Sequence, residues 1–133
     1  MTAAACSNGN KKAGPTTSAG KTTTSTGPAP PKLAAVPFRL GVASGDPTHD
    51  SGILWTRLAP DPDNGGGMPD QDVPVRWEVG TTDTFTKVVT SGEAVALANC
   101  AHSVHVDATG LSPAQEYWYR FQVGDYETAP ART

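Results

Sequence analysis

The chain has 133 residues, of which 37% are hydrophobic and 17% are charged, a length with room for one domain. Residues 1–35 hold four lysines and no acid, whereas the remainder holds six basic and thirteen acidic residues, a balance of −7. Such an acidic body argues against nucleic acid as the main partner, because phosphate neutralisation requires a basic face. No apolar run of about 20 residues occurs, so no transmembrane segment is predicted.

The N-terminal segment has the composition of a flexible tether. Residues 7–32 are rich in Ser, Thr, Pro and Gly and contain no Val, Ile, Leu, Phe, Tyr or Trp. Burial therefore cannot offset the entropy of ordering this backbone. We expect residues 1–35 to be disordered and residues 36–133 to form the folded domain.

Cys6 ends a run of small residues, "AAAC", that resembles the end of a bacterial lipoprotein signal. Ala3 stands where Leu is usual, and Met1 leaves no room for a charged start followed by a long apolar run. Two interpretations stay open: a longer natural form that is lipidated at Cys6, or a chance resemblance. The only membrane contact expected is through such a lipid anchor.

From Val36 onward, apolar residues recur at every second position, the period of a strand with one buried face. Turn-forming Gly, Pro, Asp and Ser residues separate the apolar segments, and Ser91 and Gly92 are expected to form one of these turns. The expected strands, in chain order, are 38–43, 52–58, 75–80, 85–90, 93–98, 103–107 and 117–123. About seven short strands without helical periodicity predict an all-β sandwich of the immunoglobulin type.

The first connection, "SGDPTHDS" at 44–51, places Asp46, His49 and Asp50 close together, and a metal-dependent hydrolase would use such side chains. Gly45 and Pro47 are instead turn formers. Because the segment lies between two expected strands, we interpret it as a structural turn and assign no metal ligand to it.

The loop 61–72 is rich in side-chain oxygens, which are the ligands that calcium prefers. Asp61, Asp63 and Asp72 match positions one, three and twelve of a calcium-binding loop, but Gly65 occupies position five and flanking helices are not expected. A solvated loop is the main interpretation, and weak calcium binding is the alternative.

Cys100, His102 and His105 are soft and borderline ligands that could suit zinc. On a regular strand, Cys100 and His102 face one side and His105 the other, so the three should not converge. We expect a partly buried His102 and a solvent-facing His105. Cys6 is the sole other cysteine and lies in the tether, so no structural disulfide is expected.

The segment "DATGLSPAQEYWYRF" has Leu111, Pro113 and Tyr117 at the spacing of a tyrosine corner. In that arrangement the tyrosine hydroxyl bonds back to upstream backbone as the chain enters the next-to-last strand. This spacing is similar to that of fibronectin type III domains. Trp55 or Trp77 is then expected to be the large aromatic residue between the two sheets.

Trp118 and Arg120 should lie side by side on the face opposite the expected core row of Tyr117 and Tyr119. Trp and Arg are both enriched where proteins meet, so this pair is a candidate interdomain surface. The alternative is that Trp118 is covered by loops of its own domain or by the second sheet.

Taken together, several motifs occur in the order and spacing of one known family. They are "FRLGVASGDPTHDSGILWTRLAPDP", "GGGMPD", "VPVRWEV", "AHSVHVDATGLSPAQEYWYRF" and "TAPART". Over residues 36–133 the sequence resembles the N-terminal domain of the PhoD family, the alkaline phosphatase D type phosphodiesterases and phosphatases. The resemblance implies an extracytoplasmic enzyme that hydrolyses phosphate mono- and diesters with iron and calcium ions. It also implies that the metal-bearing catalytic domain follows the β-domain.

We therefore expect this chain to be a fragment of such a hydrolase, stopping at Thr133 before the metallophosphoesterase domain that would be its partner. No catalytic, cofactor-binding or metal-binding residue is assigned, and by itself the chain should hydrolyse nothing. The alternative function is a free-standing fibronectin-like binding module at the cell surface, since fold alone does not fix function.

Overall fold

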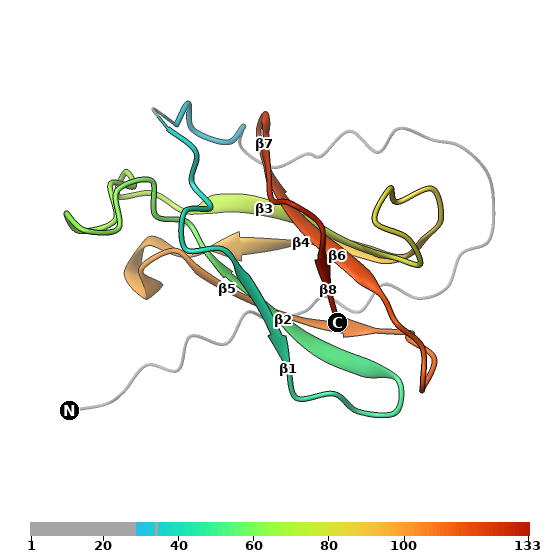
Figure 1. Cartoon of the computed structure of the whole chain (residues 1–133). Coiled ribbons are helices and arrows are strands. Elements are labelled where there is room, and N and C mark those ends of the chain that lie inside the picture. Colours follow the sequence, from blue (N-terminus) through green and yellow to red (C-terminus); the bar gives the residue numbers. More distant parts are fainter. Residues whose placement is uncertain (1–28, 34) are drawn as a thin grey trace, which may run out of the picture.

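The computed structural model describes residues 29–33 and 35–133, which form two antiparallel β-sheets (Figure 1). The predicted tether and Cys6 lie outside the described residues, apart from the few at the end of the tether. The strands are β1 (Val42–Gly45), β2 (Ser51–Arg57), β3 (Val73–Gly80), β4 (Val88–Ala96), β5 (Ser103–Thr109), β6 (Trp118–Val123), β7 (Tyr126–Glu127) and β8 (Ala131–Arg132). A short 3-10 helix, η1 (Ala98–Cys100), precedes β5.

The strands divide into a three-stranded and a five-stranded sheet. The smaller sheet has the order β1-β2-β5, and the larger has the order β4-β3-β6-β7 with β8 also paired to β6. This arrangement confirms the predicted all-β, sandwich-like fold. In the described residues, no helix is long and apolar enough to cross a membrane.

Alternate residues of each central strand point into one shared core, as the period-two pattern predicts. Leu54 on β2, Val75 and Trp77 on β3, and Phe121 on β6 are buried. Of the two tryptophans considered for the core, Trp77 is the buried one, whereas Trp55 is half-buried on the outward face of β2. The core is therefore built by both sheets.

The expected strands 85–90 and 93–98 are one continuous strand, β4, and the expected turn at Ser91 and Gly92 is wrong. Gly92 lies directly opposite Trp77 in the β3–β4 ladder. A Cβ atom at Gly92 would lie 2.9 Å from the indole ring, closer than real contacts allow. The glycine thus permits the close approach of a large side chain within a strand and does not mark a turn.

The first strand begins later than predicted, at Val42 in place of Phe38. A tight turn occupies the expected start, because the Gly41 N–H donates to the Phe38 carbonyl at 3.0 Å. Gly41 has a φ of +75°, which a residue with a side chain rarely adopts. Phe38 is nevertheless buried and belongs to the core.

The predicted tyrosine corner is present. The Ser112 N–H donates to the Tyr117 hydroxyl oxygen at 2.8 Å, and Tyr117 is 4% exposed. The Tyr117 backbone also exchanges two hydrogen bonds with Thr133, of 3.1 and 2.9 Å. The corner therefore ties the entry of β6 both to the preceding loop and to the segment that includes β8.

Candidate functional site

The outward face of the five-stranded sheet carries the predicted pair Trp118 and Arg120. Both are half-buried, and they alternate along β6 with the buried residues Tyr119 and Phe121. Gln122 follows on the same outward face. The predicted placement of Trp118 and Arg120 on one face is thus found.

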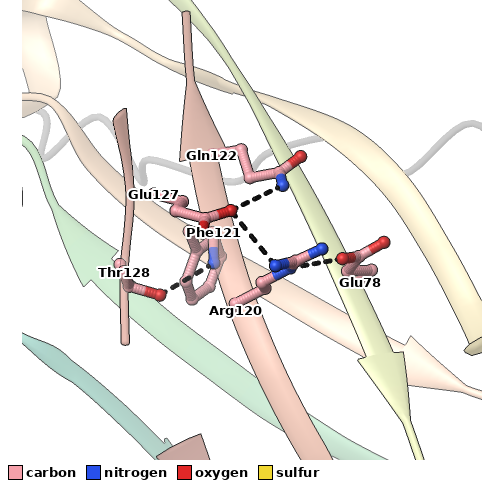
Figure 2. Close-up of polar contacts among 6 residues, drawn as sticks. All are labelled: Glu78, Arg120, Phe121, Gln122, Glu127 and Thr128. Carbon is pink, nitrogen blue, oxygen red and sulfur yellow. Dashed lines mark hydrogen bonds and ion pairs between the residues drawn. The ribbon is translucent and has the colours of Figure 1, made fainter. Parts of the chain in front are cut away.

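Arg120 is held within the domain by two carboxylates (Figure 2). Its Nε donates to the Glu78 carboxylate on β3, and its Nη1 donates to Oε2 of Glu127 on β7 at 3.1 Å. The Gln122 amide donates to the same Glu127 oxygen at 3.2 Å. The Arg120 side chain is only 25% exposed, so the network is partly shielded from solvent.

An aromatic ring covers the same guanidinium. The Cζ atom of Arg120 lies 4.4 Å from the centroid of the Phe85 ring, a cation–π contact. Phe85 lies in the connection between β3 and β4, is buried, and has a φ of +52°. The connection therefore folds over part of the outward face, and the charge of Arg120 is satisfied by its own domain.

Trp118 has a different environment from Arg120. Its cross-strand partners are Gly80 on β3, which offers no side chain, and Arg132 on β8. Nη1 of Arg132 pairs with the Glu116 carboxylate at 3.2 Å, and both side chains are more than half exposed. Trp118 is thus a half-buried aromatic residue beside an exposed ion pair.

The polar loop 44–51 is a turn between β1 and β2, as interpreted from the sequence. The Thr48 hydroxyl accepts the N–H groups of Asp50 and Ser51 at 3.3 and 3.0 Å, and the Thr48 N–H donates to the Ser51 carbonyl at 2.8 Å. Nδ1 of His49 lies 3.7 Å from the Asp50 carboxylate, and the His49 side chain is 86% exposed. These side chains stabilise the turn in contact with solvent.

The carboxylates of the loop 61–72 do not converge on one point. Asp61 and Asn64 are joined by hydrogen bonds of 3.1 and 3.2 Å from the Asn64 amide, and Asp61 forms an isolated bridge with Gly66. Asp72 instead accepts the Ala98 N–H at 3.0 Å, in front of η1. Two of the three ligand positions considered for calcium, Asp61 and Asp72, are therefore engaged in separate local contacts, and Asp63 is exposed.

The histidines of "CAHSVH" lie as expected from the sequence. His102 is 7% exposed, and its Nε2 donates to the Gln71 carbonyl at 2.9 Å, whereas His105 is exposed. Cys100 is part of η1 and not of a strand, and it is disulfide-bonded. The expectation of no structural disulfide is thus wrong for Cys100, and Cys6 lies outside the described residues.

Within residues 29–33 and 35–133, no group of three or more His, Cys, Asp or Glu side chains could hold a metal ion. The iron and calcium implied by the family resemblance therefore do not fit the residues that the structure describes. No step of phosphate ester hydrolysis is derived from this part of the chain.

Tyr119 is a buried titratable residue of the core. Burial raises the pKa of its hydroxyl above the ordinary value of 10.0, and a side-chain hydrogen bond with Ser44 partly opposes the shift. Ser44 lies on β1, so the phenol of β6 spans from the larger sheet to the smaller one. Its ring also packs edge-on against Phe121, with centroids 6.2 Å apart.

The sequence did not indicate Glu78, Phe85 and Glu127 as partners of Arg120. Glu78 is 42 residues from Arg120, and only the register of β3 against β6 brings the two together. The alternation does place Glu78 outward, next to the inward Trp77 and Val79. This alternation is the one signal in the sequence. It predicts on which face of the sheet Glu78 lies, but not that Arg120 lies next to it.

Comparison with known proteins gives concordant results. The family model for the N-terminal domain of PhoD-like phosphatases matches residues 21–133. Alkaline phosphatase D of Bacillus subtilis (strain 168) is 57% identical over 102 residues, which cover 77% of this chain and 17% of that protein. A solved structure of PhoD superposes with a TM-score of 0.75 at 54% identity, covering 77% of this chain and 20% of that chain. The chain therefore belongs to the PhoD-like phosphatases and corresponds to their N-terminal domain.

Proposed function

We propose that this domain is the noncatalytic N-terminal module of a larger, extracytoplasmic alkaline phosphatase D-like enzyme. The observation that carries the proposal is the family match over residues 21–133 together with the small share, 17% and 20%, of the relatives' lengths. In this view the iron- and calcium-dependent hydrolysis of phosphate esters belongs to the metallophosphoesterase domain. The role of the β-sandwich is to pack against that domain.

In this proposal the catalytic domain packs on the outward face of the five-stranded sheet, around Trp118. β8 runs beside Trp118 on β6, and the relatives extend well beyond the matched region. In this proposal the catalytic domain lies next to Trp118 and the Glu116–Arg132 ion pair. A large aromatic residue near an ion pair is the composition found at the centre of domain and protein interfaces.

The two residues of the surface have separate roles. Arg120 is neutralised by Glu78 and Glu127 and covered by Phe85, so it fixes the shape of the surface. No hydrogen bond or ion pair joins the Trp118 side chain to another described residue, and in this proposal Trp118 is the side chain that inserts into the partner domain. Trp118 is thus the anchor of the interface, and Arg120 supports the sheet that presents it.

The matched pair Trp118→Ala and Trp55→Ala tests this interface in the complete enzyme. Both tryptophans are half-buried and face outward, but from opposite sheets. Trp118→Ala should cost the complete enzyme at least about 2 kcal/mol of unfolding free energy, the size of an interface anchor, and should lower phosphate ester hydrolysis. Trp55→Ala should leave hydrolysis unchanged. Unchanged stability and activity of the Trp118→Ala enzyme would contradict the proposed interface.

The noncatalytic role is tested on the 133-residue chain itself. The purified chain, supplied with iron and calcium ions, should hydrolyse neither a phosphomonoester nor a phosphodiester. Activity that increases with chain concentration and survives further purification would contradict the assignment. The free-standing binding module is the less supported function, because the matched relatives are a named phosphatase and a PhoD structure that are both far longer than the match.

A further inference from the structure

A groove of about 390 Å³ lies at the end of β2, and neither Trp118 nor the Glu116–Arg132 ion pair lines it. Its walls come from the end of β2, from the loop 65–70 and from the segment 98–102. The volume is within the range of about 300–1,000 Å³ that is usual for small-molecule sites. Its polar lining residues are Arg57, Asp70, Asn99 and His102, and Leu58 is among its apolar ones.

Arg57 is the fixed cation of this groove. Its Nε donates to the Ala101 carbonyl at 3.0 Å, which orients the planar guanidinium. The side chain is half-buried, yet no carboxylate of the described residues lies within ion-pair distance of it. Its Nη donors are therefore available in the fork geometry that matches a carboxylate.

The loop around Arg57 brings backbone close to the guanidinium. Gly66 is buried with a φ of +91°, and a Cβ atom there would lie 3.9 Å from Nη2 of Arg57. Any side chain at Gly66 would thus enter the space beside the guanidinium. The backbone bridge between Asp61 and Gly66, with hydrogen bonds of 2.9 and 2.8 Å, holds the loop in this position.

The opposite wall is tied to the same loop region. His102 donates from Nε2 to the Gln71 carbonyl, and Asp72 accepts the Ala98 N–H. These two bonds connect the residues after the loop 65–70 to the segment 98–102. The groove is thus formed by segments that are held together, which lowers the ordering cost of binding a ligand.

Asp70 supplies a charge of opposite sign on the wall. Its carboxylate is exposed and makes no hydrogen bond or ion pair with the described residues, and the same is true of the Asn99 amide. Arg57 and Asp70 line one groove but do not pair with each other. A ligand with separated charges could therefore contact both side chains, whereas a dianion would be repelled by Asp70.

We propose that this groove binds a small zwitterion of the amino-acid type. The ligand carboxylate forms a bidentate pair with the Arg57 guanidinium, and its ammonium group is attracted by Asp70. The Asn99 amide adds a hydrogen bond at the rim. This site is independent of the packing surface around Trp118, and it would exist whether or not a catalytic domain packs there.

The experiment titrates the 133-residue chain separately with alanine, acetate and inorganic phosphate. Binding is monitored through the amide chemical shifts of the chain. Alanine should give saturable shifts confined to 57–58, 65–70 and 98–102, with a dissociation constant of about 1 mM or weaker for so open a site. Acetate should bind less tightly than alanine, because it lacks the ammonium group. Phosphate should bind least, because Asp70 repels a dianion.

Two variants and one matched control separate the contributions of the Arg57 and Asp70 side chains to ligand binding. Arg57→Gln should weaken alanine binding at least about tenfold, equal to about 1.4 kcal/mol. Arg39→Gln is the control, since Arg39 also donates to a backbone carbonyl, that of Pro60, but does not line the groove. Asp70→Asn should weaken alanine binding and strengthen acetate binding, a change of opposite sign that damage to the fold would not produce.

Three results would each overturn the proposal. The first is that alanine gives no saturable shifts at the groove. The second is that Arg57→Gln binds alanine as tightly as the parent chain does. The third is that phosphate binds more tightly than alanine. Asp70 is exposed and unpaired within the described residues, so Asp70→Asn remains informative even if Arg57→Gln fails to fold.

Discussion

Gly92 on β4 and Trp77 on β3 are direct cross-strand partners, and the indole ring occupies the space that a Cβ atom at Gly92 would need. Trp77 is 6% exposed although β4 is an edge strand with mostly exposed residues. The missing side chain therefore lets the largest core residue reach the edge of the five-stranded sheet. This contact extends the core under β4.

Gly92→Ala should destabilise the domain by about 1–3 kcal/mol, the usual cost of overpacking a well-packed site. The clash is with ring atoms of Trp77 at 2.9 to 3.1 Å, which cannot move without disturbing the core. Chemical denaturation would measure the loss. Gly52→Ala on β2 is the matched control, because a Cβ atom there meets its nearest neighbour only at 3.9 Å. Equal effects of the two changes would contradict the packing argument.

Tyr117→Phe should cost about 0.5–1.5 kcal/mol, because the Ser112 N–H loses the hydroxyl that accepts it. The ring itself remains, so the core packing of Tyr117 is preserved. Tyr126→Phe is the control, since the Tyr126 hydroxyl makes only a long 3.5 Å contact with the Leu33 carbonyl. Thermal unfolding of the two variants should show a clearly larger shift for Tyr117→Phe, and the reverse order would exclude a stabilising corner.

The features that the sequence predicts well are those that depend on neighbours along the chain. Alternation places Tyr117 and Tyr119 in the core correctly, and the spacing from Leu111 to Tyr117 predicts the corner hydrogen bond. Both follow from the period of a strand and from contacts only a few residues apart. Such local rules need no knowledge of which strands pair.

The features that escape prediction depend on pairing between distant segments. Glu78 meets Arg120 only through strand register, and Arg57 meets Ala101 across 44 residues. The expected turn at Gly92 is wrong for the same reason. In isolation a Ser-Gly pair is typical of a turn, and only the position of Trp77 explains Gly92 as part of a strand. A surface or groove built from such contacts becomes visible only in the folded chain.

The buried Tyr119 hydroxyl should make the folded domain less stable at alkaline pH. Burial raises the pKa of its hydroxyl in the folded state, so the unfolded chain releases the proton first as the pH rises. The contribution of the neutral phenol is fully present below a pH of about 10 and decreases as the pH rises above it. Denaturation followed between pH 8 and about 11 should show less decline in Tyr119→Phe than in the parent chain. Tyr126→Phe, which keeps the buried phenol of Tyr119, should decline like the parent, and an identical decline in all three would refute the assignment.

Arg120→Met should destabilise the domain although it preserves much of the apolar stem. The change leaves Glu78 and Glu127 close together without their shared cation, and the Glu78 side chain is only 21% exposed. We expect a cost between that of an exposed pair, up to about 1 kcal/mol, and that of a buried pair, about 3–5 kcal/mol. Arg132→Met is the control, because its pair with Glu116 is more than half exposed and should contribute less than about 1 kcal/mol. The cost of Arg120→Met should also fall when Glu78→Gln is added, since the uncompensated charge is then removed. Without that coupling in a double-mutant cycle, Arg120 would not be the residue that holds this face together.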